Sequence, residues 1–362
     1  MSNFFEPNII NYVVFSFVGS FLLTFYLIPK IIKVVNHKQL MDSPNSRSSH
    51  QKLTPAFGGV SFYFIIILTL LFLGKSIDDD QISLNIIAAT TILLFTGLKD
   101  DLVVISNFSK LIGQVSAGCL FLYEMSYTDL NFYGAFGITE ITGIAGFGMM
   151  LFFMLIIINA FNLIDGIDGL AASIGVVTLS FFGYIYYQLE TPFYVVLCIA
   201  MIGSLLAFLR FNFSTKKKIF MGDTGSLILG FMIAVMSVKF MSLRASDYEV
   251  ISVNPKHSIF IIIAILVFPF FDTARVFILR ILNKKNPFLA DNNHTHHILL
   301  NLGNSHTKSS VLIILFSILI TILLFIASTF IESSWLMLGV YAFTFLLFYA
   351  IFMQFASKKN LE

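Results

Sequence analysis

The sequence predicts an all-α integral membrane protein, a polytopic bundle of about eleven transmembrane helices. Of its 362 residues, 57% are hydrophobic and 12% are charged, whereas about a quarter of a typical soluble domain is charged. Several apolar runs reach the roughly 20 residues that a helix needs to cross a hydrocarbon layer about 30 Å thick. Because lipid offers no partner to backbone polar groups, these runs are expected to be helical.

The expected spans follow from the apolar runs, at residues 9–29, 57–74, 83–98, 111–124, 145–163, 171–188, 193–210, 225–241, 259–282, 311–330 and 335–356. The first eleven residues lack the basic region of a signal peptide, so the first span is expected to be retained. Cys119 and Cys198 both lie in apolar runs, and no disulfide framework is expected. No long linker or repeat divides the chain, which predicts a single transmembrane domain over residues 1–362.

Charge alternates between successive connections. Lysines gather in the first, third, seventh and ninth connections and at the C-terminus, on the same side as the fifth connection, and acidic residues dominate the connections between these. The positive-inside rule then places the N-terminus outside and the C-terminus in the cytoplasm. The cytoplasmic segments, at about residues 30–56, 98–110, 163–171, 210–224 and 283–310, hold most of the histidines and the candidate carboxylates.

The most polar stretch directly follows the apolar run at residues 147–158 and closes the fifth span. Asn159, Asn162, Asp165 and Asp168 lie three residues apart and would form one stripe on a continuing helix. Carboxylates at the end of a membrane helix are costly unless water, a cation or a substrate meets them. The alternative is a polar loop without chemistry, which the matching polar residues elsewhere in the chain disfavour.

Two further groups lie in the first and third connections. Asp100 and Asp101 are adjacent carboxylates, which resist joint ionisation unless a cation neutralises them or one acts as a base. Lys110 follows nearby, and Lys52 precedes a Thr-Pro-x-x-Gly-Gly turn. The lysines are candidates to meet phosphate, although Lys52 can equally be a topogenic, snorkelling lysine and the aspartates a solvated turn.

The seventh and ninth connections complete the polar inventory. Asp223 lies among glycines just before a helix, where free N–H groups attract phosphate and a carboxylate can hold Mg²⁺. A plain capping aspartate is the alternative, and the P-loop pattern is absent. His294, His296 and His297 suggest zinc, but no neighbouring Cys or Glu completes a tetrahedral set. Asp272 and Arg275 are expected to satisfy one another within the bundle.

These residues suit the joining of an anionic, nucleotide-linked substrate to a lipid phosphate with a divalent cation. The rival class is a secondary transporter or flippase, in which ionisable groups lie near the membrane midplane. Here the middles of the spans are almost without charge, and the carboxylates lie at the cytoplasmic ends. A purely structural scaffold would have no use for so many acids at helix ends.

The motifs also resemble a known family, the polyprenyl-phosphate N-acetylhexosamine-1-phosphate transferases. The resemblance rests on motifs in the family order that run from the first cytoplasmic loop to the ninth connection: Lys52-x-Thr-Pro-x-x-Gly-Gly, Asp100-Asp101, Lys110, Asn159-x-x-Asn162-x-x-Asp165-Gly-x-Asp168-Gly-Leu, Phe220-Met-Gly-Asp223-x-Gly-Ser and His294-x-His296-His297. The Asn/Asp stretch and the Gly-Asp-x-Gly-Ser stretch together are highly specific.

The resemblance implies a reaction at the cytoplasmic face of the bacterial inner membrane. A UDP-N-acetylhexosamine and undecaprenyl phosphate would give undecaprenyl-diphospho-N-acetylhexosamine and UMP, with Mg²⁺ or, as a substitute, Mn²⁺ as cofactor. By similarity, Asp223 matches the metal ligand, and Asp100 or Asp101 the carboxylate that prepares the lipid phosphate. Lys52 and Lys110 would meet phosphate oxygens, and His296 or His297, with His294 in the same motif, would lie near the diphosphate or sugar.

The nucleotide side is implied in the same way. The stretch that contains Asn159, Asn162, Asp165 and Asp168 matches the nucleotide-contacting residues, Phe220 the ring that stacks on uracil, and Asn212 another residue on that side. One more position than expected separates Asn212 from Asp223, in a segment with three successive lysines. A homodimer is plausible for the family, and no nucleic-acid partner is expected.

The branch of the family is also suggested by resemblance. The His-x-His-His pattern and eleven spans resemble the GlcNAc-1-phosphate branch, which starts O-antigen, common-antigen or teichoic-acid chains. The peptidoglycan branch, which transfers phospho-MurNAc-pentapeptide, usually has contiguous histidines and about ten spans. Direct displacement is preferred to a covalent aspartyl-phosphate, because metal and lysines already reduce the repulsion between two anions.

Overall fold

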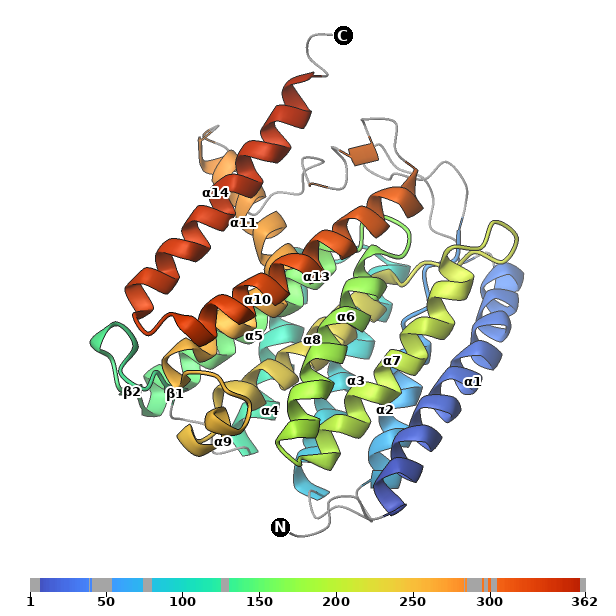
Figure 1. The fold of residues 1–362 in the computed structure, drawn as a ribbon. Helices are drawn as coiled ribbons and strands as arrows, with labels where there is room; N and C mark the ends of the chain where they lie inside the picture. Colours follow the sequence, from blue (N-terminus) through green and yellow to red (C-terminus); the bar gives the residue numbers. More distant parts are fainter. Residues whose placement is uncertain are drawn as a thin grey trace.

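The computed structural model describes residues 7–38, 40, 54–73, 80–124, 130–282, 284, 295, 299–300 and 305–358. This part of the chain is almost entirely helical (Figure 1). The first half contributes α1 (Pro7–Lys38), α2 (Val60–Leu73), α3 (Asp80–Leu102), α4 (Asn107–Glu124), α5 (Gly143–Ile164) and α6 (Leu170–Gln188). The second half contributes α7 (Pro192–Asn212), α8 (Gly222–Met241), α9 (Ala245–Val250), α10 (Ser258–Ile265), α11 (Val267–Leu282), α13 (His306–Phe330) and α14 (Ser334–Lys358).

Each apolar range expected to span the membrane coincides with a helix or, for residues 259–282, with the pair α10 and α11. By length and composition, seven helices in the described residues can cross a membrane, or eight if that pair is counted as one bent span. The helix α4 is not among the seven, and Val60–Phe72 of α2 and Ser334–Ala350 of α14 are shorter apolar stretches. The all-α membrane fold is therefore confirmed, and eleven crossings stay a prediction.

The range 259–282 is not the single straight helix that the sequence suggested. The helix axis bends by 77° between Ile265 and Val267, and Leu266 between them has φ −102° and ψ 24°. Pro269 has no N–H to donate to the carbonyl of Ile265 four residues earlier, so the helical hydrogen-bond ladder is interrupted at the bend. The single apolar segment predicted from the sequence consequently forms two helices, α10 and α11, that run in different directions.

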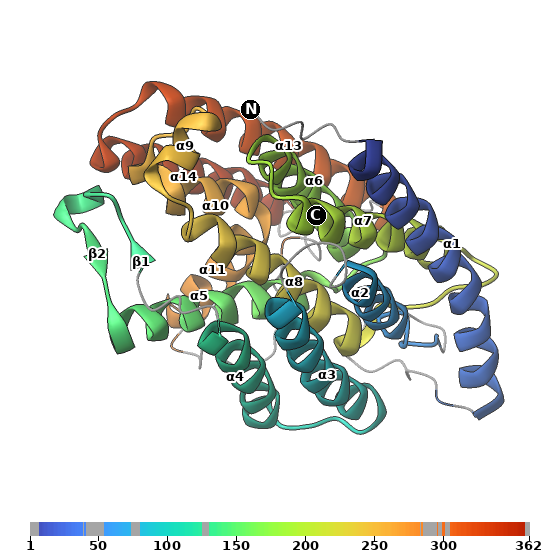
Figure 2. The ribbon, with the colours of Figure 1, turned by 90° about the horizontal axis from the view of Figure 1, so that it is seen from below.

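Helix α8 lies in the centre of the bundle (Figure 2). Within its spanning window 94% of the residues are buried, compared with 17% for α1 at the edge. Close packing at the start of α8 depends on glycine, because a Cβ on Gly59 of the α1–α2 connection would lie 2.0 Å from the Cα of Gly225. A Cβ on Gly97 of α3 would lie 2.3 Å from the Cα of Thr224. Backbones thus touch at the start of α8 and fix its position.

A small hairpin closes the opposite end of the bundle, where α1 and α14 begin (Figure 1). Its strands, β1 (Leu130–Asn131) and β2 (Glu140–Ile141), pair antiparallel around the 3₁₀ turn η1 (Ala135–Gly137), and a second such turn, η2 (Pro255–His257), precedes α10. The ring of Phe136 packs edge-on against Trp335 and Phe260. The two ends of the bundle therefore differ: one carries an aromatic cap, and the other carries the polar residues described next.

Candidate active site

The candidate site is centred on Asp223, the second residue of α8. Gly222 before it has φ +74°, and a Cβ there would lie 1.9 Å from the carbonyl oxygen of Ala56 and within 3 Å of the Asp101 carboxylate. A residue other than glycine would be strained both by the backbone angle and by these contacts. The glycine therefore lets the chain enter α8 with Asp223 directed at its partners.

The segment before α8 is hydrogen-bonded to the segment before α2. The N–H of Phe220 donates to the carbonyl of Pro55 (2.7 Å), and the N–H of Gly58 donates back to the carbonyl of Phe220 (2.9 Å). The N–H of Gly59 donates to Met221 (2.9 Å). The Thr-Pro-x-x-Gly-Gly and Phe-Met-Gly-Asp motifs, far apart in the sequence, thus form one unit.

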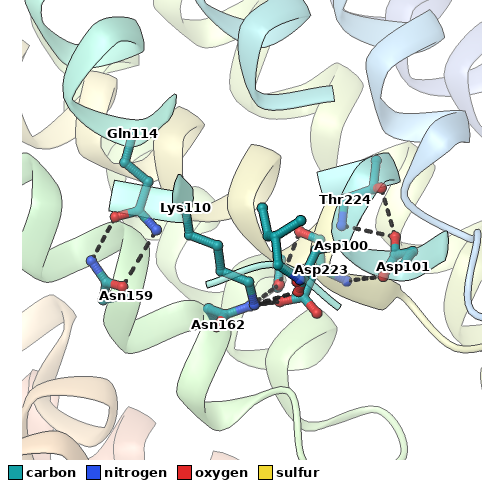
Figure 3. Close-up of polar contacts among 10 residues, drawn as sticks. Asp100, Asp101, Lys110, Gln114, Asn159, Asn162, Asp223 and Thr224 are labelled. Carbon is teal, nitrogen blue, oxygen red and sulfur yellow. Dashed lines mark hydrogen bonds and ion pairs between the residues drawn. The ribbon is translucent and has the colours of Figure 1, made fainter. Parts of the chain in front are cut away.

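Three other helices, α3, α4 and α5, bring polar side chains to the region of Asp223 (Figure 3). The ammonium of Lys110 on α4 lies 2.8 Å from Oδ1 of Asp223 and 2.5 Å from Oδ2 of Asp100 on α3. The amide of Asn162 on α5 donates to the same Oδ1 of Asp223 (2.6 Å) and to the hydroxyl of Ser226 (2.9 Å). Side chains from α4 and α5 therefore meet at one carboxylate oxygen of α8, and Asp100 of α3 joins them through Lys110.

The two adjacent aspartates of α3 have different partners (Figure 3). Asp101 accepts hydrogen bonds from the backbone N–H groups of Asp223 (2.7 Å) and Thr224 (3.1 Å) and from the Thr224 hydroxyl (2.6 Å). It caps the N-terminus of α8 from another helix, where a negative charge is stabilised by the helix dipole. Asp100 instead contacts Lys110, beside Asp223.

A second polar cluster surrounds Asp168 in the α5–α6 turn. Lys218 donates to its Oδ2 (2.6 Å), Nδ1 of His306 lies 3.9 Å from the same oxygen, and the Ser310 hydroxyl donates to its backbone carbonyl (2.8 Å). The Lys218 ammonium also lies 5.2 Å from the centre of the Phe220 ring, a cation–π contact. Lys218 and His306 are absent from the sequence-based set; the three successive lysines were the only signal for the first.

Asp165 lies just beyond the end of α5, between the two clusters. Its partial burial raises the pKa of its carboxyl well above the usual range, and the negative charges of Asp223, Asp101 and Asp168 raise it further. Carboxylates outnumber ammonium groups in this region, and a cation would relieve that imbalance.

Two predicted substrate-binding amides are hydrogen-bonded within the protein. Asn212 accepts from the N–H of Gly169 (2.5 Å) and donates to the carbonyl of Ile219 (2.8 Å), holding the two loops of the Asp168 cluster together. Asn159 pairs with Gln114 of α4. Contacts of Asn159 and Asn212 with a nucleotide stay predictions.

Four predicted site residues lie outside the described residues: Lys52, His294, His296 and His297. Thr295, between the histidines in sequence, is described, and its N–H donates to Oδ1 of Asp272 (2.7 Å). Asp272 and Arg275 are both buried in α11. Asp272 thus accepts a hydrogen bond from a backbone N–H, and its pairing with Arg275 stays a prediction.

The donor set fits a cation shared with a substrate better than a closed metal centre. In the described ranges, no group of three or more His, Cys, Asp or Glu side chains could hold a metal ion. Asp223 and Asp100, on either side of Lys110, offer the one or two carboxylates through which proteins hold Mg²⁺ together with phosphate oxygens. The arrangement can therefore bind phosphate groups and a divalent cation at one point.

Comparison with known proteins agrees with this chemistry. The model of glycosyl transferase family 4 matches residues 83–241, which include Asp100, Lys110, Asn162 and Asp223. The chain is 31% identical over 312 residues to the probable undecaprenyl-phosphate N-acetylglucosaminyl 1-phosphate transferase of Bacillus subtilis, covering 86% of this chain and 83% of the relative.

Two more relatives are informative. The undecaprenyl-phosphate alpha-N-acetylglucosaminyl 1-phosphate transferase of Yersinia pestis is 30% identical over 315 residues, 85% of this chain and 83% of the relative. The phospho-N-acetylmuramoyl-pentapeptide-transferase of Clostridium perfringens is 32% identical over 250 residues, 64% of this chain and 76% of the relative. The chain therefore belongs to the polyprenyl-phosphate sugar-1-phosphate transferases of glycosyl transferase family 4, and it is a phosphosugar transferase.

Proposed function

We propose that the protein transfers N-acetylhexosamine-1-phosphate, specifically GlcNAc-1-phosphate, from its UDP-sugar to undecaprenyl phosphate and releases UMP. One observation carries the proposal: Lys110 and Asn162 converge on a single oxygen of Asp223 at the start of a buried membrane helix. Anionic groups from a lipid and from a nucleotide can meet there. The names of the relatives that cover most of the chain support this choice.

The reaction is a single displacement. An oxygen of the lipid phosphate forms a bond to the β-phosphorus of the UDP-sugar, and the bond from that phosphorus to the α–β bridging oxygen breaks. UMP leaves with the bridging oxygen and its electron pair, and the sugar–phosphate bond stays intact. Because both reactants are anions, the protein must mainly position them and neutralise charge.

The contacts of Lys110 and of the two aspartates of α3 suggest separate roles. Lys110, held between Asp100 and Asp223, lies where it can neutralise phosphate oxygens during transfer. Asp100 accepts any remaining proton of the lipid phosphate. Asp101 is committed to the N-terminus of α8 and keeps Asp223 in place.

Asp223, with Asp100 beside it, would hold Mg²⁺, or Mn²⁺ in its place. The ion would stabilise the charge that develops on the phosphate oxygens and on the leaving group. Burial and the neighbouring carboxylates raise the pKa of Asp165, and positive charge beside it would favour its ionised form.

The nucleotide would lie against the Asp168 cluster. Uracil would stack on Phe220, whose ring already contacts the Lys218 ammonium. Asn162, Asp165 and Asp168 would line this side, with Lys52 and the histidine motif completing the diphosphate and sugar contacts.

We place this reaction at the cytoplasmic face of the bacterial inner membrane, as the first step of a lipid-linked cell-envelope polysaccharide such as an O-antigen or a teichoic acid. The basic residues near this end of the bundle support that orientation. A homodimer is part of the proposal.

The second candidate is transfer of phospho-MurNAc-pentapeptide, favoured by the Clostridium perfringens relative. That relative matches 64% of this chain, compared with 86% and 85% for the two GlcNAc-1-phosphate relatives. Because this relative matches less of the chain, UDP-MurNAc-pentapeptide is the less favoured donor.

The test is UMP release by the purified protein in detergent, with undecaprenyl phosphate, Mg²⁺ and a panel of UDP-sugars that includes UDP-MurNAc-pentapeptide. We expect release that requires lipid phosphate and metal, is fastest with UDP-GlcNAc, and falls at least about 1,000-fold in Asp223→Asn, comparable to the loss of a central electrostatic group. Folded protein that is inactive with every donor would refute the proposal.

A further inference from the structure

A pair of amides joins α4 to α5 beside the site (Figure 3). Nδ2 of Asn159 donates to Oε1 of Gln114 (2.8 Å), and Nε2 of Gln114 donates back to Oδ1 of Asn159 over 3.4 Å. The second hydrogen on Nδ2 of Asn159 goes to the carbonyl of Leu155 (2.7 Å). Gln114 is 2% exposed. The pair is a two-way hydrogen bond inside the bundle, with both N–H bonds of Asn159 in use.

The pair lies one helical turn from the reacting centre. Gln114 follows Lys110 by four residues on α4, and Asn159 precedes Asn162 by three on α5, so each amide shares a helix face with one ligand of Asp223. Lys110 and Asn162 contact the same oxygen of Asp223 at 2.8 and 2.6 Å. Sliding or rotation of α4 against α5 would separate them.

Hydrogen bonds are suited to prevent that movement. Within a membrane, apolar contacts do not strongly fix how two helices are placed, because lipid is as apolar as the side chains, and polar pairs across the helices supply orientation. A two-way amide pair also defines one relative position of the helices, since a slip of one turn would leave buried amide groups without partners.

We propose that Gln114 and Asn159 are positioning residues: their amide pair sets the placement of Lys110 against Asn162, and neither amide binds substrate. This inference rests on the proposed function, because it assigns the pair to the transfer reaction. It adds Gln114 to the site and gives Asn159, expected from the sequence to contact the nucleotide, a different role.

The test combines removal of the pair with its exchange. Gln114→Leu and Asn159→Leu each replace an amide by an apolar side chain and so remove the pair. The double variant Gln114→Asn with Asn159→Gln moves one methylene from α4 to α5, so the pair can form again. We expect each single variant to lose about 10- to 100-fold in kcat, the range for a small misplacement of reacting groups, with the KM of each substrate changed less than about 3-fold. The exchange should restore kcat to within about 3-fold of the original protein.

A matched control separates positioning from general stability. The hydroxyls of Thr24 on α1 and Ser204 on α7 form a buried hydrogen bond of 2.7 Å between helices that carry neither Lys110 nor Asn162. Thr24→Val removes that bond with little change in shape. We expect the Tm of Thr24→Val in detergent to fall about as much as that of Gln114→Leu while its kcat is unchanged.

Three results would overturn the inference. One is an unchanged kcat in both single variants. Another is a raised KM for one substrate in Asn159→Leu but not in Gln114→Leu, together with an exchange variant that is as impaired as the single variant Asn159→Gln. That result would mean that Asn159 binds the substrate directly. The third is an equal loss of kcat in Thr24→Val, which would reduce the pair to a stability role. Failure of the unmodified protein to release UMP would instead refute the proposed function.

Discussion

Asp100 and Asp101 are neighbours in the sequence, yet they contact different parts of the molecule. Asp101 caps α8, and Asp100 contacts Lys110. From the sequence either one could be the base, because the direction of each side chain depends on where α3 ends relative to α8. The structure resolves their partners, which gives the two positions different expected mutant behaviour.

Asp101→Ala should mainly reduce stability. Loss of an N-cap costs about 0.5–2 kcal/mol, and we expect a clear fall in Tm with a secondary loss of activity. Asp100→Ala also loses a backbone hydrogen bond from Ile105, but we expect its main effect on kcat, a fall of about 100-fold or more, as for removal of an acid–base group. Thermal unfolding in detergent and UMP release, measured on both variants, check this; a stable, inactive Asp101→Ala with an active Asp100→Ala would contradict it.

Asp165 predicts how stability depends on pH. Partial burial, and then the neighbouring carboxylates, raise the pKa of Asp165 in the folded protein. The folded state therefore keeps a proton that the unfolded chain loses above about pH 4. The free energy of unfolding falls as the pH rises from this value towards the raised pKa of the folded protein. Without Mg²⁺, we expect Asp165→Asn to have a higher Tm than the original protein at neutral pH and a shallower decline from about pH 5 to 8. Parallel Tm–pH curves for the two proteins would exclude this role of Asp165.

The missed residues have a common physical reason. Gln114, Lys218 and His306 contribute through partners on other elements, and the ion pair of Lys218 with Asp168 spans 50 positions of sequence. Local spacing cannot show such pairs. Asp223, Asp100 and Asn162, which the structure brings together, were predicted because several polar groups at a helix end are costly in a membrane unless they serve a purpose.

At the scale of elements, hydropathy located the helices but not their directions. The ranges expected to be apolar all became helices, since each backbone must satisfy its own hydrogen bonds in lipid. The bend between α10 and α11 was missed because hydropathy averages over a window, although Pro269 marks the place. Short helices such as α2 likewise give an apolar signal whether or not they cross the membrane.

Contact between the start of α8 and the segment before α2 predicts a contrast between two glycines. Gly59→Ala would place a Cβ 2.0 Å from the Cα of Gly225, and neither backbone can give way cheaply. We expect the free energy of unfolding to fall by about 1–3 kcal/mol, the usual cost of overpacking. Activity should also fall, because Gly225 is only two residues from Asp223 in α8. Gly148→Ala, with nothing within 4 Å of its Cβ, should be neutral or up to about 1 kcal/mol stabilising. The Tm and kcat of both variants test the contrast, and equal effects would argue against the packing explanation.

At the scale of the whole molecule, polar chemistry and apolar bulk are separated along the bundle. The site, the starts of α8 and α13, and the ends of α1 and α14 share one end, and the hairpin and α9 lie at the other (Figure 1). The sequence predicted this division from charge alone, because lysines are retained on the cytoplasmic side during insertion. The charge pattern could not predict which helices form the centre of the bundle. The burial of 94% of the membrane-spanning window of α8 results from packing by all the neighbouring helices.

The orientation itself gives the last prediction. In a background with Cys119→Ala and Cys198→Ala, we introduce a single cysteine by Glu140→Cys in the hairpin or by Lys217→Cys in the α7–α8 connection, both at exposed positions. The positive-inside rule places three successive lysines in the cytoplasm, so an impermeant maleimide should label Glu140→Cys in intact cells and Lys217→Cys only after the membrane is opened. UMP release by both variants shows that the protein is folded. The reverse pattern would place Asp223 and its partners outside, away from cytoplasmic UDP-sugars, and would contradict both the orientation and the reaction proposed at this end of the bundle.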